Sequence, residues 1–522
     1  MRALVSSTTV ALLILTAGAA GLRAQGNQVE PGKLAQSDPS QISSFGGWFG
    51  WSVAVSGDTA VVGAPTKDDF GELSGAAYVF VRDPIEQDVW TQVLKLLPSD
   101  ARRAQQFGRS VAISGDTIIV GAVGDDEQGQ FTGSAYVFER HQGAPNSWAQ
   151  TMKLRASGAA GGDVFGESVS ICDDRIVVGA PQDQGPPFPR PPGFATIFER
   201  NHGGIGAWGE VVRLTAPSNA QPRGFGRVVA VSGDTVVAGV TANQVTAYVF
   251  SRNQGGSDAW GQAAALSSPG NSVAVSGETA IVGTTILGRD RTTGTWVEVA
   301  KLVPEVAHNL SFQSSVAISG DTAILGVPDD DEKGGLNSYS GSAFVFRRDQ
   351  GGPNAWGQVL KLTASDGVAG DQFGRSVAIS GSTAIVGAPT FGGKPGSAYA
   401  CQLDEVNTVT GACRRAIPVV NNLITMSNMT TSCCDAGQFT ITATFTNSSE
   451  KSIRQPFFEV ISLSAGTVIQ NADGGPGGLG ATLTPVSDGT ISPGESITVT
   501  FVLSFSTPVL WIHTNIRGEP GL

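Results

Sequence analysis

The stretch that decides the fold is Phe49-Gly50-Trp51-Ser52-Val53-Ala54-Val55-Ser56-Gly57-Asp58-Thr59, because it recurs along the chain. It returns as Phe107–Thr117, and further copies begin at Phe165, Phe225, Phe312 and Phe373. One more copy, Pro269–Thr279, lacks the Phe but keeps Ser-Val-Ala-Val-Ser-Gly-Glu-Thr. Seven copies that start 43 to 61 residues apart indicate a repeat architecture in which each copy is one structural unit.

Each copy predicts four β-strands. Alternating Ser-Val-Ala-Val-Ser forms the first strand, and Gly57-Asp58 suits a two-residue type II′ turn, since glycine accepts the positive φ needed there. The second strand runs from Thr59 to Gly63 and ends in Gly-Ala-Pro. The third is typified by Gly133–Phe138, and the fourth starts at a tryptophan, as in Trp148–Leu154. The apolar first two strands indicate burial on both faces, whereas the mixed fourth strand indicates an outer edge.

Seven antiparallel four-stranded units predict a seven-bladed β-propeller, which limits open sheet edges by closing into a ring. Only six fourth strands follow their own repeat, so one is missing after the last third strand, Gly396–Leu403. The segment Asn27–Asp38 echoes Gly357–Asp366, the fourth strand and link of an earlier copy. We therefore expect the N-terminal segment to complete blade seven and latch the ring; the alternative is a loose N-terminal tail.

Phe-Gly followed by Gly-Ala-Pro resembles the FG-GAP repeats of the integrin α-subunit propeller. The residues resemble more closely the bacterial branch with Ser-Gly-Asp-Thr-Ala between the two signatures, over about residues 26–403. The resemblance implies an extracellular seven-bladed propeller that serves adhesion or ligand binding. In integrin-type repeats a calcium loop can lie between the signatures, but here that stretch is a tight turn such as Gly57-Asp58, too short for about 6–8 oxygen ligands.

The chain has 522 residues and a formal net charge of −12. This acidity argues against binding to nucleic acid and to anionic lipid. Arg2 followed by apolar Val10–Ala20 and small residues up to Ala24 is typical of a signal peptide, so we expect cleavage near Ala24 and a secreted or cell-surface protein. The alternative, a membrane anchor, is disfavoured because the apolar stretch is too short to span a bilayer. No later segment is typical of a transmembrane helix.

The predicted domain order is signal peptide 1–24, propeller 25–405, linker 406–417 and a second all-β domain 418–522. In the second domain, Gln438–Asn447 alternates Phe439, Ile441, Ala443 and Phe445 with threonines, the pattern of a half-buried strand. Its length of about 105 residues predicts a smaller Ig-like β-sandwich.

The five cysteines fit an exported protein. Cys172 lies alone inside a repeat, where we expect a small buried thiol. Cys433 and Cys434 are adjacent and therefore too close to bond to one another. We expect each to form a disulfide with Cys401 or Cys413, in either order.

Carboxylates gather in the loops between the second and third strands, and these loops should share one face with the links between blades. They are Asp68, Asp69 and Glu72; Asp125, Asp126 and Glu127; and Asp329, Asp330, Asp331 and Glu332, with Asp100, Asp163, Asp366 and Asp371 in the links. Such a face would attract cationic partners or divalent ions, with a weak calcium site at Asp329–Glu332 as the one metal candidate. The alternative is that these residues only keep a secreted protein soluble.

The sequence contains no nucleophile elbow, zinc-protease motif or Walker motif. The recurring tryptophans suit blade packing better than sugar stacking. We therefore expect no catalytic residues and no cofactor, and a monomer that binds an extracellular protein or glycan through the loop-bearing face. The alternative is a glycan hydrolase or lyase, which would need Asp125, Asp330 and an arginine such as Arg289 around one pocket.

Overall fold

The computed structural model describes two β-rich units. It covers residues 9–13, 32–38, 42–84, 89–127, 129–141, 146–182, 192–217, 224–241, 245–254, 256–268, 271–304, 315–331, 338–390, 395–403, 409–411, 413–415, 424–433, 438–447, 453–463, 467–469, 482–483, 490–493, 495–505 and 509–520. All regular secondary structure within these ranges is β-strand, and no helix occurs among the described residues. One compact unit is Val29–Arg415, and the other combines Met1–Gln28 with Ala416–Leu522.

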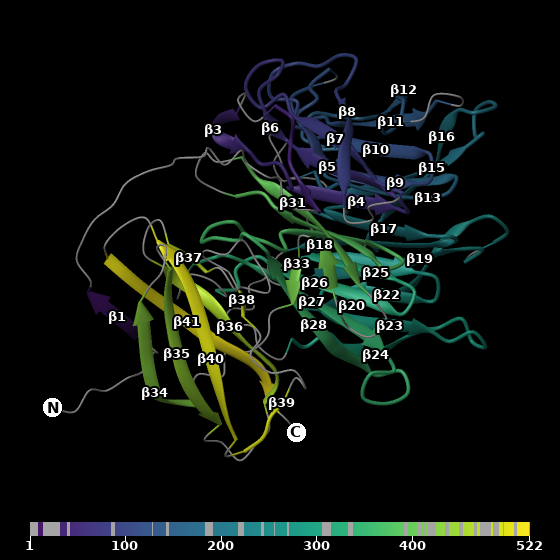
Figure 1. Cartoon of the computed structure of the whole chain (residues 1–522). Helices are drawn as coiled ribbons and strands as arrows, with labels where there is room; N and C mark the ends of the chain where they lie inside the picture. Colours follow the sequence, from purple (N-terminus) through teal and green to yellow (C-terminus); the bar gives the residue numbers. More distant parts are fainter. Residues whose placement is uncertain are drawn as a thin grey trace. The chain divides into compact units, whose positions relative to one another are not determined.

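The first unit is a seven-bladed β-propeller, coloured from purple to green in Figure 1. Blades one to three each contain four antiparallel strands: β4 (Ser52–Ser56), β5 (Thr59–Ala64), β7 (Ala76–Arg82) and β8 (Trp90–Leu96); β9 (Phe107–Ser114), β10 (Thr117–Ala122), β11 (Ser134–Arg140) and β12 (Trp148–Leu154); β13 (Ser168–Cys172), β14 (Arg175–Ala180), β15 (Phe194–Arg200) and β16 (Trp208–Thr215). Blades four and five repeat this order: β17 (Val228–Ser232), β18 (Thr235–Thr241), β19 (Val245–Arg252) and β20 (Trp260–Ser268); β21 (Val273–Ser276), β22 (Thr279–Val282), β23 (Thr285–Arg289) and β24 (Trp296–Lys301).

Blades six and seven carry additions at their outer edges. Blade six is β25 (Ser315–Ser319), β26 (Thr322–Val327), β27 (Ser342–Arg348) and β28 (Trp356–Ala364), and β33 (Cys413–Arg415) pairs with β28. Blade seven is β29 (Ser376–Ser380), β30 (Thr383–Ala388) and β31 (Ser397–Leu403), followed by β2 (Lys33–Leu34). β32 (Val409–Gly411) also pairs with β31, so β32 and β33 lie in the segment expected to be a linker.

The repeated residues explain the blade geometry. Gly57 has a φ of 54° and, with Asp58, joins Ser56 to Thr59 in register, as predicted for the turn. Gly108, of the second Phe-Gly, has a φ of 90°, and a Cβ there would lie 2.3 Å from the backbone oxygen of Ala76 in blade one. This glycine therefore lets neighbouring blades approach each other closely.

The core lies between adjacent blades. Val61 and Val79 of blade one pack in one cluster with Phe107 and Ile118 of blade two. The second strands are buried along their whole length in blades one, two and seven, as expected for a strand covered on both faces. The tryptophans that start the fourth strands are buried at five positions, Trp90, Trp148, Trp208, Trp296 and Trp356, in agreement with a packing role.

The N-terminal latch is confirmed where the structure describes it. Lys33 and Leu34 pair with Tyr399 and Ala398 of the last third strand, and the Ala400 N–H donates to the Gly32 oxygen at 2.8 Å. Leu34 is fully buried. Residues 27–31 of the predicted latch lie outside the described residues. β32 pairs with the other half of the same edge, so two short strands together occupy the place of the missing fourth strand.

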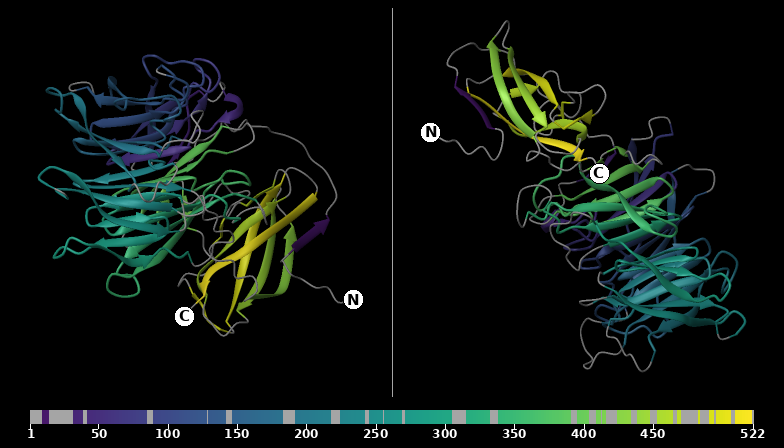
Figure 2. Two further views of the ribbon diagram at one scale, coloured as in Figure 1. Left: turned by 180° about the vertical axis from the view of Figure 1, so that it is seen from behind. Right: turned by 90° about the horizontal axis from the view of Figure 1, so that it is seen from below.

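The second unit contains two antiparallel sheets, which Figure 2 shows in green and yellow, with β1 in purple. One has the order β34 (Ile424–Cys433), β35 (Gln438–Asn447), β40 (Ser496–Phe505) and β37 (Thr467–Ile469). The other has the order β1 (Thr9–Leu13), β41 (Val509–Pro520), β36 (Ile453–Leu463) and β38 (Thr482–Leu483), with β39 (Thr490–Ile491) beside β36. The strand predicted at Gln438–Asn447 is present, and Phe445 is buried on it. The Ig-like topology stays a prediction.

The signal peptide also stays a prediction. Within the expected leader, β1 pairs with β41, from Thr9 opposite His513 to Leu13 opposite Val509. None of the described residues forms a helix long and apolar enough to cross a membrane.

Two cysteines can be placed. Cys172 is a half-buried free thiol in the first strand of blade three. Cys401 is buried in β31 and is disulfide-bonded. The side chains of Cys413 and Cys433, and the whole of Cys434, lie outside what the structure describes, so the predicted pairing stays a prediction.

Candidate functional site

The loops between the second and third strands do share one end of the propeller with the links between blades. The link before blade two bonds to the blade-one loop: the Ala104 N–H donates to Glu72 O at 2.8 Å, and the Gln106 N–H to Leu73 O at 2.9 Å. The same contact joins Val164 to Phe131 one blade further on. We call this end the loop-bearing face; the opposite end, which carries the Gly-Asp turns, is the turn face.

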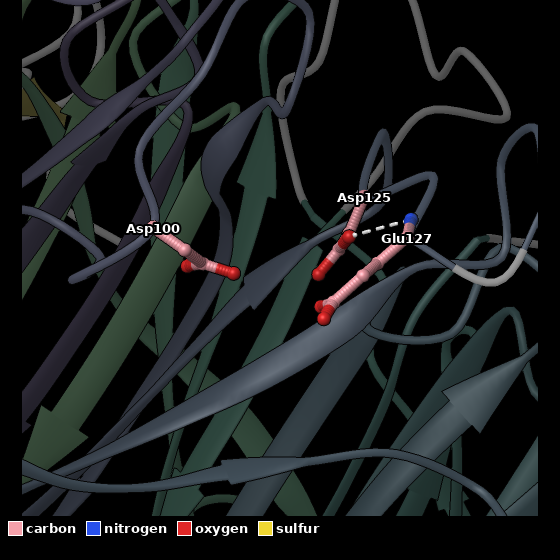
Figure 3. Close-up of side chains that lie close together, drawn as sticks. All are labelled: Asp100, Asp125 and Glu127. Atoms are coloured by element: carbon pink, nitrogen blue, oxygen red, sulfur yellow. Dashed lines mark hydrogen bonds between the residues drawn. The ribbon is translucent and has the colours of Figure 1, made fainter.

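On the loop-bearing face of blade two, three carboxylates surround one lysine. Lys153 Nζ, from β12, lies 2.5 Å from Asp100 Oδ2, 2.5 Å from Asp125 Oδ2 and 2.7 Å from Glu127 Oε2. One oxygen of each carboxylate lies within 4.8 Å of the others, as in a metal-binding cluster, and Figure 3 shows these side chains near one another. The lysine ammonium group therefore occupies the place that a bound metal ion would take.

Hydrogen bonds fix this cluster. The Tyr136 hydroxyl donates to Asp100 Oδ1 at 2.9 Å, and Ser134 Oγ donates to Asp125 Oδ2 at 2.6 Å. Burial alone would raise the pKa of Asp125, but hydrogen bonds from Lys153 and Ser134, together with positive charge nearby, hold it below its ordinary value. Burial and the adjacent carboxylates raise the pKa of Tyr136. Asp125 is thus an ionised structural anion.

The arrangement recurs between other blades. Lys95 Nζ lies 2.5 Å from Asp38 Oδ2 and 2.6 Å from Asp69 Oδ2, while the Tyr78 hydroxyl donates to Asp38 at 2.8 Å. At the ring closure, Lys33 pairs with Asp366, to which the Tyr399 hydroxyl donates at 2.7 Å. In each case an aspartate from the link before a blade contacts the lysine and tyrosine of that blade. The sequence carries the signal as Lys-Leu-x-x-Ser-Asp, at Lys33–Asp38, Lys95–Asp100 and Lys361–Asp366.

Two of the candidate calcium ligands already bind other groups of the protein. Asp330 is fully buried, and its Oδ2 lies 2.8 Å from Lys361 Nζ. Asp331 Oδ1 accepts from the Tyr339 N–H at 3.1 Å. Glu332 lies outside the described residues. Calcium at Asp329–Glu332 would have to displace the Lys361 ammonium from Asp330, and it stays a prediction.

The remaining carboxylates of the loop-bearing face also make contacts within the loops and links. Asp68 Oδ1 accepts from the Leu73 N–H at 2.8 Å, and Asp126 lies 3.1 Å from Arg102 Nε. The link residues Asp163 and Asp371 accept from the N–H groups of Ala160 and Val368, three positions earlier. The acidic loop residues therefore stabilise the loops through ion pairs and turns. Asp69 belongs to the Lys95 cluster, and Glu127 to the Lys153 cluster.

A second group of charged residues lies at the start of the innermost strands, directly after Phe-Gly. Going round the ring, this position holds Arg375, Trp51, Arg109, Glu167 and Arg227 in blades seven, one, two, three and four. Each contacts the next, and we call these five residues the axial arc. In the sequence they are the variable residue directly after Phe-Gly, a position that belongs to none of the known catalytic motifs.

Arg289 lies elsewhere. It ends the third strand of blade five, at the turn face, and pairs with Glu278 at 3.7 Å. It lines a cavity of about 530 Å³ that also includes Asp290 and Arg348. Asp125 and Asp330 instead pair with lysines on the loop-bearing face of blades two and six. The three residues that an enzymatic pocket would have required thus have separate partners in separate blades.

Comparison with known protein families detects the same repeat as the sequence pattern. A family model described as FG-GAP repeat matches residues 31–80, 90–138, 148–188, 296–346 and 356–401. A search of curated proteins returned no match.

Among solved structures, the chain is similar to the computationally designed Ika4 protein, with 12% identity, a TM-score of 0.24, and coverage of 39% of this chain and 90% of that chain. It is also similar to proposed 6-phosphogluconolactonases of Bacteroides fragilis NCTC 9343 and Bacteroides uniformis ATCC 8492. Both have 12% identity and a TM-score of 0.29 and cover 48% of this chain, with 82% and 83% of their own chains. These low scores carry no argument about function. The repeated signatures, the family match and the seven blades together show that the chain belongs to the FG-GAP repeat β-propeller proteins.

Proposed function

We propose that the protein is an extracellular binding or adhesion protein that uses the loop-bearing face of its propeller to bind an extracellular protein or glycan. The observation that carries this proposal is the way the loops are built. Buried ion pairs such as Lys153 with Asp125 anchor the loop bases to the blades, while the loops themselves differ in length and sequence from blade to blade. A rigid scaffold with variable loops suits recognition.

Exposed side chains on these loops provide contact points. Phe70 in the blade-one loop and Tyr339 in the blade-six loop are exposed, as is Val368 in the link before blade seven. Aromatic residues are enriched at the centres of protein interfaces. The leader-like residues 1–24 support export, so the binding partner is expected outside the cell.

The enzymatic alternative finds less support. A glycosidase needs a carboxylic acid whose pKa is raised so that it can protonate the leaving group. The Lys153 and Lys95 clusters do the reverse, since their hydrogen bonds lower the pKa values of Asp100, Asp125 and Asp38 despite the raising effect of burial.

The test is a binding screen with the full chain after export. We expect N-terminal sequencing of the exported protein to begin near Gln25, and light scattering to give a monomer. The protein is then applied to arrays of glycans and extracellular proteins, with calcium and with chelator. A hit that is weakened by the double variant Phe70→Ser/Tyr339→Ser, but not by a matched turn-face change such as Ile205→Ser, supports the proposal. Release of reducing ends from a polysaccharide panel by the wild-type protein would contradict it.

A further inference from the structure

The axial arc is a continuous chain of side chains at the centre of the loop-bearing face. The guanidinium carbon of Arg375 lies 4.4 Å from the ring centre of Trp51, and that of Arg109 lies 4.8 Å from the same centre. Arg109 then makes a two-pronged contact with Glu167, at 3.0 and 3.2 Å, and Arg227 reaches Glu167 at 3.3 Å. Five consecutive blades thus contribute one side chain each.

The composition of the arc points to a negatively charged ligand. It contains three guanidinium groups and one carboxylate, and Arg109 engages both oxygens of that carboxylate. The side chains of Arg109 and Arg227 are 23% and 30% exposed, so both remain partly accessible to solvent. Guanidinium groups present several N–H donors in a planar fork, a geometry that matches a carboxylate.

The arc also brings like charges together. The guanidinium groups of Arg375 and Arg109 both lie over the indole ring of Trp51, and Trp48 stacks against this ring at 4.8 Å between ring centres. Burial lowers the pKa of Arg375 and the nearby charge of Arg109 lowers it further, while the charge of Asp329 offsets only part of this shift. An anion that contacted both guanidinium groups would relieve this repulsion.

Blade five supplies one more polar group at the same position of the repeat. Asn271 follows Gly270 where the other blades have Trp51 or Arg109, and its Oδ1 atom is buried without a hydrogen-bond partner. A buried acceptor of this kind is costly unless something donates to it. A protonated or N–H-bearing group of a ligand would satisfy it.

We propose that the axial arc binds the carboxylate of a single Asp or Glu side chain on a partner protein. This inference rests on the proposed function and names the chemistry of its central contact. A single carboxylate fits better than a polyanionic glycan, because the chain carries a net charge of −12 and exposed carboxylates such as Glu72 and Asp126 lie on the same face. An acidic polymer would be repelled by this surface, whereas one acidic side chain amid neutral or basic residues would not.

The test uses the full chain and two matched peptide libraries on a surface. Each peptide of the first library has one Asp among neutral and basic residues, and the second replaces that Asp by Asn. We expect the wild-type protein to prefer the Asp library, and Arg109→Gln and Arg375→Gln each to lower the affinity for the best Asp peptide about tenfold or more. Arg103→Gln is the control, since it removes the same charge from an exposed residue on the same face and should leave binding unchanged.

Folding of the variants is checked by thermal unfolding, and Arg375→Lys keeps the charge if the glutamine variant unfolds. The lysine variant should retain more binding than a neutral replacement but less than the wild type. Equal binding to both libraries, unchanged affinity of Arg109→Gln, or tighter binding to a heparin oligosaccharide than to any Asp peptide would overturn the inference. If the array hits depend on Phe70 and Tyr339 but not on Arg109, the proposed function stands and only this inference fails; if nothing binds at all, both fail.

Discussion

The backbone N–H of Gly57 in blade one donates to Ser380 Oγ in blade seven at 3.1 Å, although 323 residues separate them. The same bond joins every neighbouring pair of blades on the turn face: Gly115 to Ser56, Asp173 to Ser114, Gly233 to Cys172, Gly277 to Ser232, Gly320 to Ser276 and Gly381 to Ser319. Seven such bonds form a closed cycle. Ring closure therefore uses the contact that joins all other blades, with the N-terminal strand added at the outer edge.

The first prediction concerns that outer edge. Leu34 is fully buried against blades seven and one, where it packs in one cluster with Phe49 and Ala398. We expect Leu34→Ala to lower the free energy of unfolding by about 2–5 kcal/mol, because it leaves a cavity at the seam of the ring. Urea denaturation measures the change. Val297→Ala on the exposed outer strand of blade five is the matched control and should cost no more than about 0.5 kcal/mol. Equal effects of the two variants would mean that the latch does not stabilise the ring.

The second prediction concerns the ammonium at the centre of the blade-two cluster. Lys153→Met would remove the ammonium group that Asp100, Asp125 and Glu127 share, leaving Arg102 beside Asp125 and Arg155 beside Glu127. We expect the free energy of unfolding to fall by about 3 kcal/mol. This value lies at the lower end of the range for breaking a buried ion pair, because Asp100 and Glu127 are partly exposed.

Calcium should then restore part of the stability of Lys153→Met, since three carboxylates whose oxygens lie within 4.8 Å of one another lose the lysine they share. The melting temperature with calcium and with chelator reports this, and wild type should respond less. Lys301→Met, which removes an exposed lysine beside Glu298, is the control and should gain nothing from calcium. A Lys153→Met protein as stable as wild type would refute the structural role of the cluster.

The propeller was predictable because its signals are local and repeated. Phe-Gly, the two-residue turn and the tryptophan-led strand recur in most blades, and the seven copies of the repeat specify the ring. The latch was predictable for the same reason, since Lys33–Asp38 repeats the residues of a complete fourth strand and link.

The charged site was not predictable to the same extent. The acidic loops were expected to face solvent or a ligand, yet Asp125 and Asp330 are buried against lysines. The pairing depends on the approach of one blade to the next: Asp100 and Lys153 lie 53 positions apart in the sequence and belong to a link and a following blade. The axial arc has the same origin, because residues that contact each other, such as Arg109 and Glu167, come from different repeats.

The third prediction is a pH dependence of stability. The pKa values of Asp38, Asp100, Asp125 and Asp366 lie below the ordinary value of 3.8; burial opposes this shift, and hydrogen bonds from lysines and from tyrosine or serine hydroxyls outweigh it. These groups bind protons more weakly in the folded protein than in the unfolded chain. Their stabilising contribution is therefore complete above pH 3.8 and is lost as the pH falls through the lower folded values.

We expect unfolding free energies measured from pH 6 down to pH 2 to fall steeply below about pH 4. Asp100→Asn should make that fall shallower, because it removes one of the linked protons. Ser99→Ala, next to it in the same link, does not titrate and should shift the curve without changing its slope. An unchanged slope in Asp100→Asn would contradict the assignment.

The last prediction concerns the role of Cys172 as a hydrogen-bond acceptor between blades. In the turn-face cycle, Cys172 Sγ accepts from the Gly233 N–H at 3.4 Å, where the other blades use a serine hydroxyl. A serine is a stronger acceptor of the same size class, so we expect Cys172→Ser to keep the stability or to raise it by up to about 1 kcal/mol. Cys172→Val fills the space but offers no acceptor, and it should cost about 0.5–1.5 kcal/mol. Urea denaturation of both variants decides the point: if the valine variant matches the serine variant, the thiol serves packing alone and blade three is held by its neighbours without this bond.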